Sequence, residues 1–217
     1  MDIKQTIKGA IFDCDGTLLD SMQMWLKAEE EYLLALKHMP RPDLIDAVRP
    51  LSSLEAADYL KTEYGILKTI EQINNERNTM LEDYYFNKAG LKDGVLAVLE
   101  ELSAHGVKMC VATATDNYLV EAGLARCGIR GYFGRIFTCS EEKTSKKWPD
   151  IYIRAAEFLG TEISETIVFE DALHAIKSAK KAGFPVVAVY DQSEDDHQEE
   201  IRAISDYYYT SLDQMRL

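Results

Sequence analysis

Residues 10–21 read Ala10-Ile11-Phe12-Asp13-Cys14-Asp15-Gly16-Thr17-Leu18-Leu19-Asp20-Ser21, a short apolar run that ends in two aspartates one residue apart. An apolar run followed by polar residues recurs at 107–113, 166–171 and 184–190. Uninterrupted apolar runs of this length are typical of strands buried on both faces, as in a parallel sheet. The opening stretch therefore predicts the first strand of such a sheet, with Asp13 at its carboxyl end.

Helical segments lie between these strand-like segments. One apolar stripe recurs at the helical spacing i, i+3, i+4 and i+7, formed by Val95, Val98, Leu99 and Leu102. Gly106 follows it as a helix stop signal. Alternation of strand and helix predicts an α/β fold with a Rossmann-like parallel sheet.

Residues 18–88 interrupt that alternation because they contain helical patterns and no strand-like run. An apolar stripe at helical spacing begins at Met22 and ends at Leu36. Ser52-x-x-Glu55 has the form of a capping box that opens a second helix ending at Gly65, and Ile70–Tyr85 indicates a third. We therefore expect a discontinuous core of residues 1–17 and 89–217, with residues 18–88 as an inserted helical domain.

Composition narrows the class of protein. The 217 residues carry 24 Lys and Arg against 37 Asp and Glu, a net charge of −13 that argues against binding to nucleic-acid phosphates. The four cysteines form no CxxC pair and are expected to be reduced thiols. Met1–Thr6 lacks an apolar signal region, and no apolar run approaches the roughly 18 residues that span a membrane. We expect a cytoplasmic protein without nucleic-acid or membrane partners, either monomer or dimer.

Polar side chains at the ends of the predicted strands are the candidate chemical groups. In open α/β sheets the carboxyl ends of the strands border the ligand crevice. The residues expected there are Asp13, Asp15, Thr113, Glu170 and Asp171. Carboxylates directed at one crevice repel each other unless a cation or a proton lies among them. Mg²⁺ fits best, because it takes few carboxylates, keeps waters and bridges to substrate phosphate.

Ile11–Ser21 resembles the opening signature of the haloacid dehalogenase-like (HAD) hydrolases. Three further segments match that family in its order: Val111-Ala112-Thr113, a lysine before Pro149-Asp150-Ile151-Tyr152, and Val168–Ile176. The resemblance covers essentially the whole chain and is to the branch with phosphoglycolate phosphatases, β-phosphoglucomutases and a helical cap. It implies that residues 18–88 are the cap.

The resemblance also implies roles for single residues. Asp13 would be the nucleophile that forms an aspartyl-phosphate, and Asp15 would be the general acid and base. Thr113 would hydrogen-bond the transferring phosphoryl group, helped by the backbone amide of Ala114. Lys146 would neutralise nucleophile and phosphate.

The lysine assignment rests on spacing from Pro149, because Lys147 occupies the place where the family usually has a proline. Lys143 or Lys147 would replace Lys146 if the loop ran differently. The implied Mg²⁺ ligands are Asp13, Asp15, Glu170 and Asp171.

Substrate contacts are expected from the cap, with Asp20, Arg49 and Ser52 as candidates and Trp25 as a further one. The resemblance implies a Mg²⁺-dependent phosphatase acting on a small phosphorylated metabolite. Phosphoglycolate, small sugar phosphates and nucleoside monophosphates all remain open as substrates.

Two alternatives remain. One is a β-phosphoglucomutase-like sugar-phosphate mutase, but such mutases usually have a histidine where this chain has Trp25 and often lack the threonine found here as Thr17. The other is a protein without turnover, either a phospho-acceptor or an idle binding protein.

Overall fold

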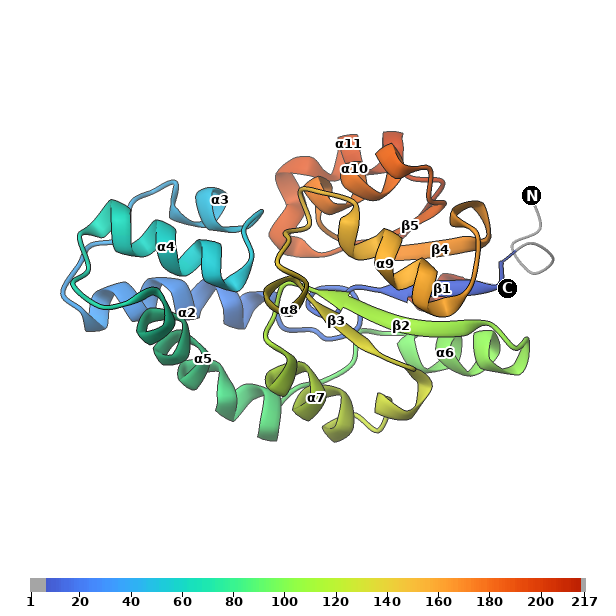
Figure 1. Cartoon of the computed structure of the whole chain (residues 1–217), viewed down its shortest axis with the longest axis horizontal. Helices are drawn as coiled ribbons and strands as arrows, with labels where there is room; N and C mark the ends of the chain where they lie inside the picture. The colour runs from blue at the N-terminus through green and yellow to red at the C-terminus, as the bar shows by residue number, and fades with distance from the viewer. Residues whose placement is uncertain (1–6, 216–217) are drawn as a thin grey trace.

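The computed structural model describes residues 7–215, and its centre is a parallel sheet (Figure 1). Within those residues the sheet has six strands in the order β3-β2-β1-β4-β5-β6, and all of the neighbouring pairs are parallel. The strands are β1 (Gly9–Phe12), β2 (Lys108–Thr113), β3 (Ile136–Thr138), β4 (Thr166–Glu170), β5 (Val186–Val189) and β6 (Tyr207–Tyr209). The predicted α/β fold with a Rossmann-like parallel sheet is confirmed.

Helices cover both faces of this sheet (Figure 1). One face packs against α6 (Val95–Ala104) and α7 (Asn117–Arg126), and the other against α9 (Asp150–Leu159), α10 (Leu173–Ala182) and α11 (Gln198–Ile204). Successive strand residues point to opposite faces, so Phe12 packs with the first group and Ile11 with the second. Burial on both faces explains why the central strands have continuous apolar runs.

Four further helices lie beside the sheet, at the left of Figure 1: α2 (Met22–Ala35), α3 (Leu44–Val48), α4 (Ser53–Tyr64) and α5 (Ile70–Asn87). They share an apolar cluster of their own that includes Leu33, Leu60 and Ile73. The capping box predicted at the start of α4 is present: the Ser52 hydroxyl accepts from the Glu55 amide, and the Glu55 carboxylate accepts from the Ser52 amide. Leu81 and Tyr85 of α5 pack instead with the core of the sheet.

The remaining elements are short: α8 (Cys139–Glu142) and the 3₁₀ turns Arg130–Tyr132, Ile163–Glu165, Gln192–His197 and Leu212–Gln214. All four cysteines are free thiols. None of the helices in residues 7–215 has the length and apolar character needed to cross a membrane. Met1–Thr6, where the sequence argued against a signal region, lies outside the described residues.

The two edge strands, β3 and β6, were not predicted as strands. Each has only three residues, and the three tyrosines of β6 are only partly buried. A segment this short has no periodicity of its own, so it becomes a strand only because a neighbouring strand offers backbone partners. Arg135 illustrates the point, since its carbonyl accepts from the Val111 amide next to β3.

Gly94 provides a test of the fold at the start of α6. Its φ of 85° is left-handed, and a Cβ there would overlap the backbone of Leu212 and Asp213. We expect Gly94→Ala to cost about 1–2 kcal/mol for the conformation, plus about 1–3 kcal/mol for the overlap. Urea denaturation measures the loss. Gly106→Ala is the control, because φ there is 72° with no atom within 4 Å, and an equal loss in both variants would contradict the overlap.

Candidate active site

The carboxyl ends of β1 and β4 bring three carboxylates together. Asp13 directly follows β1, and its amide donates to the Phe169 carbonyl at 2.9 Å. Glu170 is the last residue of β4, and Asp171 comes next. Because Phe12 of β1 pairs in register with Phe169 of β4, the residues that follow each of them lie at the same edge of the sheet. Carboxylate oxygens of Asp13, Glu170 and Asp171 lie within 4.8 Å of one another, and all three residues are buried.

Lys146 places a positive charge next to these three carboxylates. It is buried in the loop before α9, and its Nζ forms ion pairs with Asp13 and, at 2.5 Å, with Glu170 Oε1. Although burial alone lowers the pKa of Lys146, the Asp13 and Glu170 carboxylates raise it above its ordinary value. Lys143 and Lys147 are exposed. Among the three lysines considered from the sequence, Lys146 is thus the one that contacts the carboxylates.

One lysine does not balance three buried carboxylates. Burial raises the pKa of Asp13 to about 7, and the Glu170 carboxylate adds to the rise. Burial and then the Asp13 carboxylate raise the pKa of Asp171 well above its ordinary value. A divalent cation among these oxygens would remove that repulsion. The residues present therefore fit a Mg²⁺ ion.

The hydrogen bonds of the three carboxylates indicate which would hold such an ion. Glu170 uses both oxygens, since Oε1 accepts from Lys146 and from the Tyr152 hydroxyl at 2.7 Å, while Oε2 accepts from the Asp171 amide at 3.2 Å. Asp171 Oδ1 accepts from the Thr17 hydroxyl at 2.8 Å. Asp13 and Asp171 are thus better placed than Glu170 to offer an oxygen directly.

Asp15 has a different environment. Its carboxylate accepts from Ser21 Oγ at 2.6 Å, from Thr115 Oγ1 at 2.7 Å and from the Tyr85 hydroxyl. The Trp25 indole in turn donates to the Tyr85 hydroxyl at 2.8 Å. Asp15 is not a member of the three-carboxylate group, so its predicted role as a metal ligand stays a prediction.

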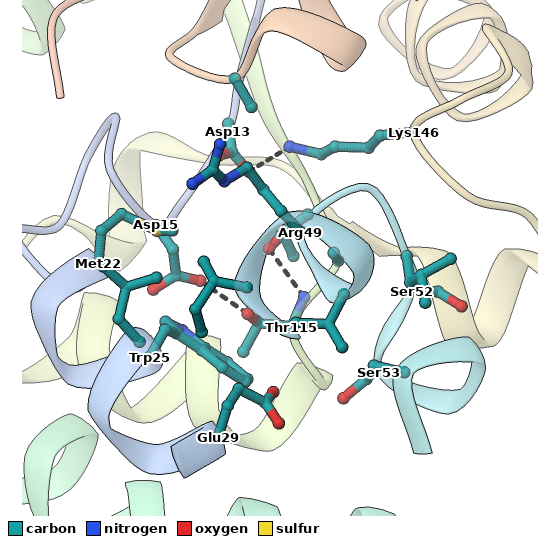
Figure 2. Close-up of a pocket in the computed structure, with 18 of the residues that line it drawn as sticks. Asp13, Asp15, Met22, Trp25, Glu29, Arg49, Ser52, Ser53, Thr115 and Lys146 are labelled. Atoms are coloured by element: carbon teal, nitrogen blue, oxygen red, sulfur yellow. Dashed lines mark hydrogen bonds and ion pairs between the residues drawn. The ribbon is translucent and has the colours of Figure 1, made fainter. Parts of the chain in front are cut away.

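A cavity connects the carboxylates to the inserted helices (Figure 2). Eight residues predicted from the sequence to bind substrate or catalyse line it: Asp13, Asp15, Trp25, Arg49, Ser52, Thr113, Ala114 and Lys146. Asp20 is exposed and is not among the lining residues. The structure therefore brings together the predicted residues of the core with Arg49 and Ser52 of the insert, and leaves Asp20 outside.

Several residues around this cavity were not singled out from the sequence. They are the hydroxyl partners Ser21, Tyr85 and Tyr152, and the charged lining residues Glu29, Arg77 and Glu194. The two tyrosines, Glu29 and Arg77 look like ordinary members of amphipathic helices, because no local pattern distinguishes a tyrosine that reaches Asp15 from one that packs. Ser21 and Tyr152 belong to motif segments quoted from the sequence, and that position was the available signal.

Comparisons with known proteins relate the chain to characterised enzymes. A family model described as haloacid dehalogenase-like hydrolase matches residues 10–189. Fructose-1-phosphate phosphatase YqaB of Escherichia coli (strain K12) is 28% identical over 185 residues, which is 83% of this chain and 95% of that protein.

Solved structures with the same fold include CbbY from Rhodobacter sphaeroides in complex with phosphate, with a TM-score of 0.82, 23% identity and coverage of 96% of each chain. β-Phosphoglucomutase from Clostridium difficile has a TM-score of 0.79 at 18% identity, covering 97% of this chain and 94% of that one.

The raised pKa values of Asp13 and Asp171 generate a prediction about metal binding. Metal ligands must be deprotonated, so Mg²⁺ has to displace a proton below pH about 7. We expect the Mg²⁺ affinity to rise by up to about tenfold per pH unit between pH 5.5 and 7, as Asp13 loses its proton. Isothermal titration calorimetry measures both the affinity and the protons released.

The controls are two aspartate variants. Asp171→Asn should lose Mg²⁺ binding, whereas Asp196→Asn, in an exposed acidic run, should keep the wild-type affinity. A wild-type affinity that is the same at pH 5.5 and pH 8 would contradict the site.

Proposed function

Because this chain belongs to the haloacid dehalogenase-like hydrolases, we propose that it is a Mg²⁺-dependent phosphatase that cleaves a small phosphomonoester through a phosphorylated Asp13. The observation that carries the proposal is the buried Asp13 carboxylate, held by Lys146 beside Glu170 and Asp171 at the mouth of a cavity. Relatives named as phosphatases, such as fructose-1-phosphate phosphatase YqaB, support it.

Asp13 is the proposed nucleophile. Its carboxylate oxygen attacks phosphorus, a new P–O bond forms to Asp13, and the bond from phosphorus to the ester oxygen breaks. Two negatively charged groups must approach each other in this step. The Lys146 ammonium offsets that repulsion from a fixed position, so no reorganisation is needed during the reaction.

Asp15 is the proposed acid and base. In the first step it gives a proton to the departing alkoxide, and in the second it takes a proton from the water that attacks the aspartyl-phosphate. The P–O bond to Asp13 then breaks, and the Asp13 carboxylate and inorganic phosphate are released. The hydroxyls of Ser21, Tyr85 and Thr115 orient the Asp15 carboxylate for this exchange.

Asp13 and Asp171 would hold Mg²⁺ directly, with Glu170 close by and Asp15 as a further predicted ligand. The ion, when bound, supplies positive charge to the phosphoryl oxygens. Thr113, a buried residue at the end of β2, and the Ala114 amide would hold the phosphoryl group from the neighbouring strand.

Residues 18–88 are proposed as a cap that covers the cavity and excludes water from the intermediate. Arg49 and Ser52 of that segment line the cavity and would contact the substrate. The substrate would be a small phosphorylated metabolite. Because the chain has four free thiols, we place the enzyme in a reducing compartment, the cytoplasm.

A mutase of the β-phosphoglucomutase type is the second candidate, and one observation bears on it. Trp25, at the position where such mutases usually have a histidine, lines the cavity and donates its indole hydrogen to Tyr85. An indole carries no exchangeable acid or base function near neutral pH. This favours hydrolysis of the aspartyl-phosphate over transfer of its phosphoryl group back to a sugar.

The proposal is tested by phosphate release from a panel of phosphomonoesters, with Mg²⁺ and with chelator. We expect Mg²⁺-dependent release by the wild type and a loss of at least about 1,000-fold in Asp13→Asn, because the amide cannot accept the phosphoryl group. Circular dichroism should show an unchanged fold.

Asp93→Asn is the control, at an exposed position away from the cavity. Substantial turnover in Asp13→Asn would refute the nucleophile. Absence of release from every ester by folded wild type with Mg²⁺ would favour the mutase or a binding role.

Lys146 is tested by comparison with its neighbour. Lys146→Ala should lower kcat by at least about 100-fold, because a fixed charge at the reacting group is lost. Lys147→Ala should stay within about twofold, since that side chain is exposed. The measurement is steady-state kinetics with a melting curve for each variant. A larger loss of kcat in Lys147→Ala than in Lys146→Ala would assign the catalytic role to Lys147 instead.

A further inference from the structure

Asp116 connects the helical insert to the core. It is the residue before α7, directly after Thr115, and it is not among the residues that line the cavity. Its Oδ2 accepts from the side-chain amides of Asn74 at 2.7 Å and Asn78 at 2.6 Å, both in α5. Its Oδ1 accepts from Ser140 Oγ of α8 at 2.9 Å. One carboxylate therefore joins α5 to two segments of the core.

The Asp116 carboxylate makes these contacts instead of capping a helix. An aspartate at a helix N-cap ordinarily accepts from a backbone amide of the first turn. Asp116 occupies the N-cap of α7, but its side chain accepts no such bond. Its partners Asn74 and Asn78 are only 5% and 2% exposed, so their buried amides depend on this carboxylate. The contacts thus give α7 nothing and fix α5 against the core.

The face of α5 that contacts Asp116 also carries Tyr85. Four buried residues at helical spacing share this face: Asn74, Asn78, Leu81 and Tyr85. The first two bind Asp116, and the last donates its hydroxyl to Asp15 Oδ1. This part of α5 packs against α7 (Figure 1). Because the four residues belong to one helix, a contact that fixes its first half also fixes the position of Tyr85.

The loop after β2 reaches Asp15 from the other side. Thr115 Oγ1 donates to Asp15 Oδ2 at 2.7 Å, and Figure 2 shows the two side chains directed at each other. Asp116 directly follows Thr115 in this loop. Its bonds to α5 therefore hold the Thr115 and Tyr85 hydroxyls in a fixed relation, one at each oxygen of the Asp15 carboxylate.

We propose that Asp116 is a positioning residue, which fixes α5 against the loop after β2 and thereby orients the Asp15 carboxylate for proton transfer. A general acid must lie within hydrogen-bond reach of the departing oxygen, so its orientation affects the rate. Asp116 acts only through Asp15, because it does not itself line the cavity. This inference rests on the proposed phosphatase function, in which Asp15 is the acid and base.

Two esters with different leaving groups separate positioning of Asp15 from a general loss of structure. A departing alkoxide needs a proton, whereas p-nitrophenolate is a stable anion near neutral pH and needs none. We expect Asp116→Ala to lower kcat/KM at least about tenfold for the alkyl phosphate that the wild type cleaves best, as part of the roughly 100- to 10,000-fold that a positioned acid contributes. For p-nitrophenyl phosphate the loss should be less than about threefold.

The conservative variant separates hydrogen bonding from charge. Asp116→Asn should stay within about threefold of wild type for both esters, because its carbonyl oxygen can accept from both α5 amides and its amide can donate to Ser140 Oγ. Asp83→Ala is the control, since Asp83 is an exposed residue of the same helix that pairs with Lys88. Equal losses for the two esters in Asp116→Ala would overturn the proposal, and so would wild-type values there.

The fluorescence of Trp25 reports on the contact of α5 without any turnover. Trp25 of α2 donates its indole hydrogen to the Tyr85 hydroxyl. The other tryptophan, Trp148, is 59% exposed, so Trp148→Phe makes Trp25 the single reporter. In that background Asp116→Ala should raise the Stern–Volmer constant for acrylamide at least about twofold, because α5 is no longer fixed, and Asp116→Asn should not.

Unchanged quenching in Asp116→Ala would overturn the proposal whatever the activities are. Increased quenching in a protein that releases no phosphate from any ester would instead overturn the proposed function, while the effect of Asp116 on α5 would stand. Melting curves check that each variant is folded. If Asp116→Ala does not fold, Asn74→Ala removes one of the two bonds from α5. It should give a smaller loss that is again larger for the alkyl phosphate, and equal losses for the two esters would overturn the proposal.

Discussion

Repulsion among three buried carboxylates, only partly offset by one lysine, is the constraint on which the rest of the structure depends. Asp13, Glu170 and Asp171 can lie within 4.8 Å only because β1 and β4 are adjacent and in register. Lys146, which belongs to the loop before α9, must then be buried beside these carboxylates. Burial and then the Glu170 carboxylate raise the pKa of Asp13, and a divalent cation would offset the repulsion that remains.

The core and the helical insert contribute different groups to the candidate active site. Groups that would meet the phosphoryl end, such as Thr113 and Lys146, belong to the sheet and its loops, where burial on both faces holds them rigidly. The insert contributes Glu29, Arg49, Ser52 and Arg77 to the wall of the cavity. Asp15 links the two parts, since it accepts from Thr115 of the core and from Tyr85 of α5. A shift of α5 would therefore disturb the proposed acid and base directly.

Much of this arrangement could be predicted from local patterns. The strand-end acids and Lys146 were named from the sequence, and they lie together. Asp20 was named for its closeness in sequence to the opening motif, yet it is exposed and does not line the cavity. Tyr85 and Arg77 were not singled out, because each occupies an ordinary helical position and gains its role only from a partner far along the chain.

The sequence by itself determined the parallel sheet, the helical insert and the acids at the strand ends, because hydrophobic periodicity and short motifs are local properties. The tertiary structure alone decided three things: the edge strands β3 and β6, the hydroxyls around Asp15, and the pairing of Arg49 with Glu194 and of Arg77 with Glu29. These depend on contacts between residues up to 145 positions apart, such as 49 and 194, whose geometry is set by packing. No local propensity encodes such distances.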